Sequence, residues 1–155
     1  EEGFIISAKS KYSDPKFVTG DIYNLEKIDG TFDLVACFGV LQNISDLEAV
    51  LKNVKSKLST RVNSKVVFTT INQNSIFNGN LPGRKLTHPN ENQEFNLNLF
   101  AKEKFEKFSQ LSGLKLNRYE YMYVFPRFLA PLSFFAKRLL PSSFSHHVLI
   151  ELQHA

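Results

Sequence analysis

The chain has 155 residues, of which 43% are hydrophobic and 22% are charged. This is the composition of an ordinary globular domain, and it excludes a disordered chain. The net charge of +4 is mild and scattered, so nothing favours nucleic acid as a partner. A single cysteine, Cys37, excludes a disulfide framework, and no apolar run approaches the roughly 18–20 residues of a membrane span. We therefore expect one cytoplasmic domain.

The first third of the chain predicts one helix and two strands. Apolar residues at helical spacing predict a helix over 3–12, which must end before Pro15. A short strand over 17–20 follows. A second strand covers 32–38, apolar apart from one aspartate, and ends in Gly39. Such a run is typical of a buried parallel strand that enters a loop at its carboxyl end, where ligands bind in open α/β sheets.

The middle of the chain predicts a helix and a further buried strand. Ser45 and Glu48 have the spacing of a capping box, and the residues that follow carry an apolar stripe at helical spacing up to position 58. Residues 65–71, "KVVFTTI", are β-branched and apolar, which again predicts a buried parallel strand.

The second half begins with a long segment of little periodicity. Residues 72–99 are rich in Asn, Gln, Gly and Pro, and a segment of this length is typical of a functional lid or a disordered excursion. A helix is predicted over 102–112, with Gly113 at its carboxyl end. A strand over 114–125 follows, then an insert at 125–145, and a last strand closes the chain at 146–153.

Four stretches, in this order, resemble the class I S-adenosylmethionine-dependent methyltransferases, in particular the small-molecule branch. They are "FVTGDI" (17–22), "FDLVACFGVLQNISDLEAVLKNVKSKL" (32–58), "VVFTTIN" (66–72) and "LFAKEKFEKFSQLSGLKL" (99–116). The resemblance implies an α/β, Rossmann-like fold with sheet order 3-2-1-4-5-7-6 and an antiparallel last strand. The chain would hold strands three to seven of that sheet as a single domain.

The resemblance also implies S-adenosyl-L-methionine as the cofactor. Its methyl group would pass to an O, N or C nucleophile of a small molecule, or of a lipid or glycan intermediate. Asp21 would contact the adenine amino group and the N–H of Ile22 a ring nitrogen, while Phe38, Gly39 and Val40 would run beside the methionine arm. For Asp21 the alternative is an Asx-turn that caps a loop, and for the 38–40 loop it is a plain connection between a strand and a helix.

Candidates for the acceptor side are less specific. Gln42 lies where many relatives have a histidine, and Tyr123 alternates with Tyr119 and Tyr121 on one strand face, which sheet packing also explains. His88 in the lid could accept a proton from a substrate hydroxyl, and its alternative is a solvated loop histidine.

Cys37 is expected to be a buried hydrophobe. No cluster of Cys, His and acidic residues predicts a metal.

Within the insert, residues 127–140 form a basic amphipathic pattern. Such a segment could touch a membrane surface peripherally, or it could pack as a cap over the mouth of the site. Nothing in the sequence indicates an oligomeric state.

In the family, a glycine-rich loop and a ribose-binding acid precede the part that this chain resembles. We therefore expect an amino-terminally truncated domain in which residues 32–155 form a four-stranded part of order 4-5-7-6. Residues 1–22 would be loosely attached, and the chain alone would bind cofactor poorly. Two alternatives stay open: a degenerate methyltransferase-like binding or scaffold module, and a nicotinamide-dependent enzyme of Rossmann type.

Overall fold

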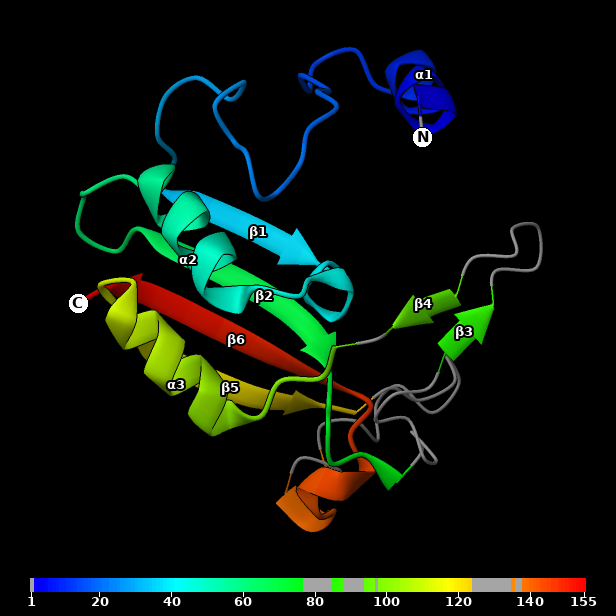
Figure 1. Cartoon of the computed structure of the whole chain (residues 1–155), viewed down its shortest axis with the longest axis vertical. Helices are drawn as coiled ribbons and strands as arrows, with labels where there is room; N and C mark the ends of the chain where they lie inside the picture. The colour runs from blue at the N-terminus through cyan, green and yellow to red at the C-terminus, as the bar shows by residue number, and fades with distance from the viewer. Residues whose placement is uncertain (1, 77–84, 88–93, 97, 124–134, 136–137) are drawn as a thin grey trace.

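The structure, a computed structural model, describes residues 2–76, 85–87, 94–96, 98–123, 135 and 138–155. Its centre is a four-stranded sheet, and two helices cover one face of that sheet (Figure 1). In sheet order the strands are β1 (Leu34–Phe38), β2 (Lys65–Ile71), β6 (His147–His154) and β5 (Leu114–Met122). The covering helices are α2 (Leu47–Ser56) and α3 (Lys102–Leu111).

The pairing of the strands confirms the predicted fold class and order. β1 runs parallel to β2, with Val35 opposite Val66. The last strand, β6, lies antiparallel to both of its neighbours, β2 and β5. In the numbering of the complete sheet this is the order 4-5-7-6, with an antiparallel strand seven, as expected.

The hydrophobic core lies between this sheet and the two helices. Strand β2 alternates fully buried side chains with half-buried ones because successive residues point to opposite faces of the sheet. The apolar stripe of α2 meets the buried face, and each fully buried aliphatic side chain contributes about 1.5–3 kcal/mol. The largest fully buried side chains are Phe68, Phe105, Leu41, Leu47, Leu51, Leu114, Ile150 and Leu152.

The opposite face and the β1 edge are far less covered. In the described part of the chain β1 pairs with β2 alone, and Leu34 and Phe38 are 56% and 65% exposed. Such an edge presents unpaired backbone groups and apolar side chains to its surroundings.

The amino-terminal region differs from the prediction in one element. Helix α1 (Glu2–Lys11) forms close to the predicted range and lies apart from the sheet, as expected for a loosely attached segment (Figure 1). The predicted strand over 17–20 is wrong, because residues 16–20 have no regular secondary structure. A strand needs a neighbour to satisfy its backbone groups, and no strand of the described chain pairs with this one.

The start of α2 is a second correction. The predicted cap was Ser45 with Glu48, but the helix begins at Leu47 and its N-cap is Asp46. The Asp46 carboxylate accepts a hydrogen bond from the Ala49 N–H at 3.0 Å. Ser45 is engaged elsewhere, since its N–H donates to the Tyr23 hydroxyl.

The second half follows the prediction in its regular elements. Helix α3 is followed by Gly113 in the left-handed conformation (φ +68°), and β5 ends three residues earlier than expected, at Met122. The segment 72–99 contains a small antiparallel pair, β3 (Lys85–Thr87) and β4 (Glu94–Asn96). His88 and most of the insert at 125–145 lie outside the described residues. A short 3-10 turn, Ser142–Phe144, leads into β6.

Candidate cofactor site

The loop that leaves β1 is tightly constrained. Gly39 has φ +68°, a conformation that favours glycine, and it turns the chain at the carboxyl end of the strand. Its N–H donates to the Thr69 hydroxyl of the neighbouring strand at 3.2 Å, and its carbonyl accepts from Gln42 Nε2 at 2.7 Å. Phe38 and Gly39 are exposed and Val40 is half-buried. The loop therefore offers a bare backbone surface with a fixed shape, as a close-lying ligand requires.

Asn98 also supports the β1 loop through two hydrogen bonds. The N–H of Asn98 donates to the Gln42 carbonyl at 2.8 Å, and Asn98 Nδ2 donates to the Ile44 carbonyl at 2.6 Å. The end of the 72–99 segment is thus attached to the loop. Gln42 Oε1 is buried and has no hydrogen-bond partner in the described structure.

Asp21 and Ile22 form the second part of the candidate site. The Asp21 carboxylate accepts the Tyr23 N–H at 2.9 Å, which is the Asx-turn that the sequence left open as an alternative. This bond uses one carboxylate oxygen. In the described chain the Ile22 N–H makes no hydrogen bond, while the Ile22 carbonyl accepts from Asn53. A carboxylate oxygen and an amide N–H are thus presented by adjacent residues.

An apolar cavity of about 280 Å³ adjoins these two residues. Asp21 and Ile22 line one side of it, and Val35, Ala36 and Cys37 of β1 line another. Cys37 is half-buried rather than buried, and this burial raises the pKa of its thiol, which favours the protonated form. The polar pair beside apolar walls fits a flat heteroaromatic ring such as adenine.

The structure connects the two parts of the site through Tyr23. This residue follows Ile22, and its hydroxyl accepts the N–H groups of Ser45 and Asp46, just beyond the loop that leaves β1. Sequence reasoning did not single out Tyr23 or its neighbour Asn53. The signal for Asn53 was available, because an Asn inside a helix between buried Val50 and Val54 usually makes a side-chain hydrogen bond.

Of the acceptor-side candidates, Gln42 lies in the loop itself, bonded to the Gly39 carbonyl, whereas Tyr123 is bonded elsewhere. The Tyr123 hydroxyl donates to the carbonyls of Leu140 and Pro141, at 3.0 and 3.2 Å. The rings of Tyr119 and Tyr121 meet edge to face at 5.6 Å, and burial raises the pKa of Tyr119 to about 12. Packing on the sheet therefore accounts for Tyr119 and Tyr121. No helix in the described part of the chain is long and apolar enough to span a membrane.

Comparison with known proteins shows which proteins have a similar sequence or fold. Residues 1–61 match the family model described as a methyltransferase domain. A search of curated proteins finds no significant match. Among solved structures, an S-adenosylmethionine-dependent methyltransferase from Clostridium acetobutylicum is 14% identical with a TM-score of 0.71. The match covers 100% of this chain and 72% of that one.

Two further structures agree. An S-adenosylmethionine-dependent methyltransferase from Mesorhizobium loti has a TM-score of 0.70 and is 14% identical. The match covers 98% of this chain and 76% of that one. Magnesium protoporphyrin IX methyltransferase from Synechocystis, solved with bound S-adenosylhomocysteine, has a TM-score of 0.57 and is 14% identical. The match covers 99% of this chain and 57% of that one. Residues 1–61 thus resemble a methyltransferase domain, and the whole described chain shares the fold of S-adenosylmethionine-dependent methyltransferases.

Proposed function

We propose that Asp21 and Ile22 hold the adenine of S-adenosylmethionine, and that Phe38, Gly39 and Val40 line its methionine arm during methyl transfer to a small-molecule acceptor. The observation that carries this proposal is that residues 21–22 and the β1 loop are held close to each other by hydrogen bonds. Tyr23 connects the Asp21–Ile22 pair to the residues that follow the β1 loop, at the carboxyl end of a parallel strand. Ligands of open α/β sheets bind at that end.

Each residue has a definite task in this proposal. The free oxygen of Asp21 accepts a hydrogen bond from the exocyclic amine, and the Ile22 N–H donates to a ring nitrogen. Gly39 lets the backbone approach the ligand closely because it has no side chain. The cofactor supplies a methyl group on a sulfonium, which is an excellent leaving group. The chain therefore needs mainly to align the reactants and exclude water.

On the acceptor side we propose Gln42 and Tyr123, with His88 as the base where the acceptor is a hydroxyl. Gln42 supports this role by its place in the β1 loop, where its Nε2 donates to the Gly39 carbonyl. Segment 72–99 would act as the lid, since Asn98 attaches its end to the β1 loop. The Synechocystis neighbour is a magnesium protoporphyrin IX methyltransferase, which supports an organic small molecule as the class of acceptor. Residues 125–145 would cap the mouth of the site, and 127–140 would make any membrane contact.

Calorimetric titration with S-adenosylhomocysteine, in the natural protein that contains this sequence, tests the cofactor assignment. We expect saturable binding that Asp21→Ala weakens by about tenfold or more, as the loss of a hydrogen bond to a charged group implies. Asp29→Ala is the matched control, because Asp29 is an exposed loop aspartate outside the site. A folded wild-type protein that binds NADH but not S-adenosylhomocysteine would overturn the proposal, and so would equal affinity in Asp21→Ala.

A further inference from the structure

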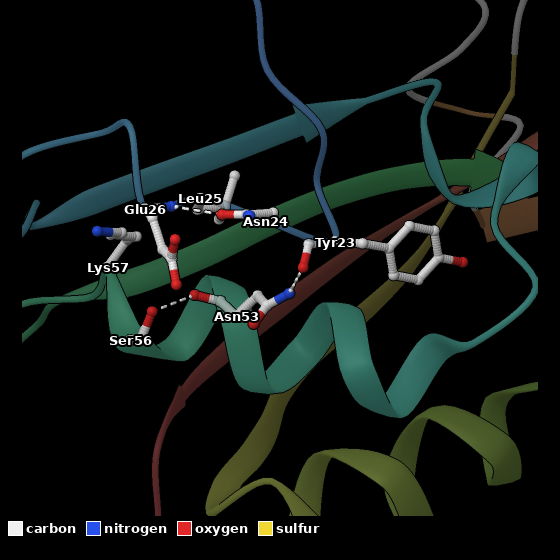
Figure 2. A pocket seen from close by; sticks show the side chains of 7 residues that line it. All are labelled: Tyr23, Asn24, Leu25, Glu26, Asn53, Ser56 and Lys57. Atoms are coloured by element: carbon white, nitrogen blue, oxygen red, sulfur yellow. Dashed lines mark hydrogen bonds between the residues drawn. The ribbon is translucent and has the colours of Figure 1, made fainter.

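The segment that carries Asp21 and Ile22 lies along helix α2 rather than in the sheet. Figure 2 shows Tyr23 to Glu26 beside this helix, with the Tyr23 ring directed towards the loop that precedes it. Because residues 16–20 form no strand, the sheet does not hold this segment in place. Another set of contacts must fix the two residues to which the adenine role is assigned.

Asn53 supplies the central contact. It is half-buried in the middle of α2, and its Nδ2 donates to the Tyr23 carbonyl at 2.5 Å (Figure 2). The same nitrogen donates to the Ile22 carbonyl at 3.3 Å. An amide nitrogen has two hydrogens, so both bonds can form together. They hold the peptide units on both sides of Tyr23, directly after Asp21.

Tyr23 supplies a second contact nearer the start of the helix. Its hydroxyl accepts the N–H of Ser45 at 2.9 Å and that of Asp46 at 3.1 Å. Hydrogen bonding from the Asp46 backbone, then from Ser45, lowers the pKa of this phenol. A third contact follows near the other end of α2, where Lys57 Nζ donates to the Ile28 carbonyl at 2.6 Å. The segment is thus attached at three points along the helix.

A polar cavity of about 220 Å³ lies between the segment and the helix. Its polar groups are largely used within the chain. The Ser56 hydroxyl donates to the Asn53 carbonyl, Asn24 Oδ1 accepts the Glu26 N–H, and Lys57 is bound to the Ile28 carbonyl. The cavity is therefore explained by the attachment of the segment and does not indicate a second ligand.

We propose that Asn53 and Tyr23 are positioning residues that hold the Ile22 and Tyr23 backbone on α2 and so set Asp21 and Ile22 for the adenine ring. This inference rests on the proposed function. Neither residue touches the cofactor in this arrangement. Both act through the backbone that follows Asp21.

The test compares Asn53→Asp, Tyr23→Phe and Lys52→Ala in the full-length protein. Asn53→Asp keeps the side-chain shape but removes the donor, and Tyr23→Phe keeps the ring but removes the acceptor. Lys52 is the control, since it lies next to Asn53 and its exposed side chain pairs only with Glu48 in the described chain. The readouts are affinity for S-adenosylhomocysteine, amide hydrogen exchange over 20–28 without ligand, and the denaturation midpoint.

We expect Asn53→Asp and Tyr23→Phe each to weaken binding by about tenfold, the equivalent of roughly one hydrogen bond, and to speed exchange over 21–25. Exchange in β2 should not change. In turnover assays, the KM for S-adenosylmethionine should rise while the KM for the acceptor stays constant, which a merely destabilised protein would not show. Lys52→Ala should behave as wild type.

Two failures are distinguishable. A folded wild-type protein that binds no S-adenosylhomocysteine overturns the proposed function. Unchanged exchange over 21–25 in ligand-free Asn53→Asp overturns the positioning role whether or not the cofactor binds. Wild-type affinity in both Asn53→Asp and Tyr23→Phe overturns it as well.

Discussion

Lys65 Nζ lies 3.0 Å from a carboxylate oxygen of Glu151, across the pairing of β2 with β6. The other oxygen of Glu151 accepts from Asn117 Nδ2 at 2.5 Å, on β5. One carboxylate therefore connects three of the four strands. Its side chain is only 11% exposed, so these bonds are poorly screened by water.

The first prediction concerns the pH dependence that this carboxylate imposes. The hydrogen bond from Asn117, followed by that from Lys65, lowers the pKa of Glu151. A lowered pKa means that the stabilisation is present above the ordinary carboxyl pKa and is lost as the pH falls through the folded-state pKa. We expect Glu151→Gln to lower the free energy of unfolding by about 1–3 kcal/mol near neutral pH.

Urea unfolding of both proteins at several pH values checks this. The difference between wild type and Glu151→Gln should shrink as the pH falls through the lowered folded-state pKa of Glu151, since the wild-type carboxyl then also becomes neutral. A difference that stays constant from neutral to acid pH would contradict the assignment.

Asn72 is expected to be a main attachment of the segment before β6. It is 2% exposed, and its Nδ2 donates to the carbonyls of Ser142 and Ser145 at 2.9 and 3.0 Å. Asn72→Ala removes both bonds and leaves the carbonyl of buried Ser145 without this donor, while the Ser142 carbonyl keeps the Ser145 N–H. The loss should cost about 2–3 kcal/mol of unfolding free energy. Asn74→Ala is the control because Asn74 is exposed. Equal denaturation midpoints for the two variants would refute this role.

The capping of α2 allows a direct comparison of neighbours. Asp46 accepts the Ala49 N–H, so Asp46→Ala should lower the unfolding free energy by about 1 kcal/mol. Ser45→Ala should cost less, because its side chain makes one contact, with the Tyr23 hydroxyl at 3.3 Å. Chemical denaturation measures the unfolding free energy of both variants and shows which residue caps the helix. A larger loss in Ser45→Ala would restore the capping box that the sequence predicted.

The sequence predicted the elements whose local and global signals agree. The apolar alternation of β2, the stripe of α2 and the glycine after α3 each fit one structure, and each formed close to the predicted range. The strand over 17–20 had the right local composition but no neighbour. Propensity alone does not form a strand, because its backbone groups need a partner.

The candidate site was predictable only in part, for a similar reason. Asp21 and Gly39 follow strand-like runs, so their place could be read from the sequence. The place of Asn53 inside a helix signals a side-chain hydrogen bond, but its partner Tyr23 lies 30 positions away and no local pattern identifies that partner. Ser45 and Asp46 are both good N-caps, and the choice between them depends on where the Tyr23 hydroxyl lies.

The last prediction separates backbone strain from cofactor binding at Gly39. Gly39 and Gly30 both have positive φ values, +68° and +79°, so alanine at either position should cost about 1–2 kcal/mol of stability. An added Cβ at Gly39 would lie 3.6 Å from Gln42 Nε2, while one at Gly30 would meet nothing within 4 Å. If the β1 loop contacts the cofactor, Gly39→Ala should weaken S-adenosylhomocysteine binding several-fold more than Gly30→Ala. Calorimetry on both variants, at a temperature where both are folded, makes the comparison. Equal affinities with equal losses of stability would remove Gly39 from the cofactor site and leave it a turn residue.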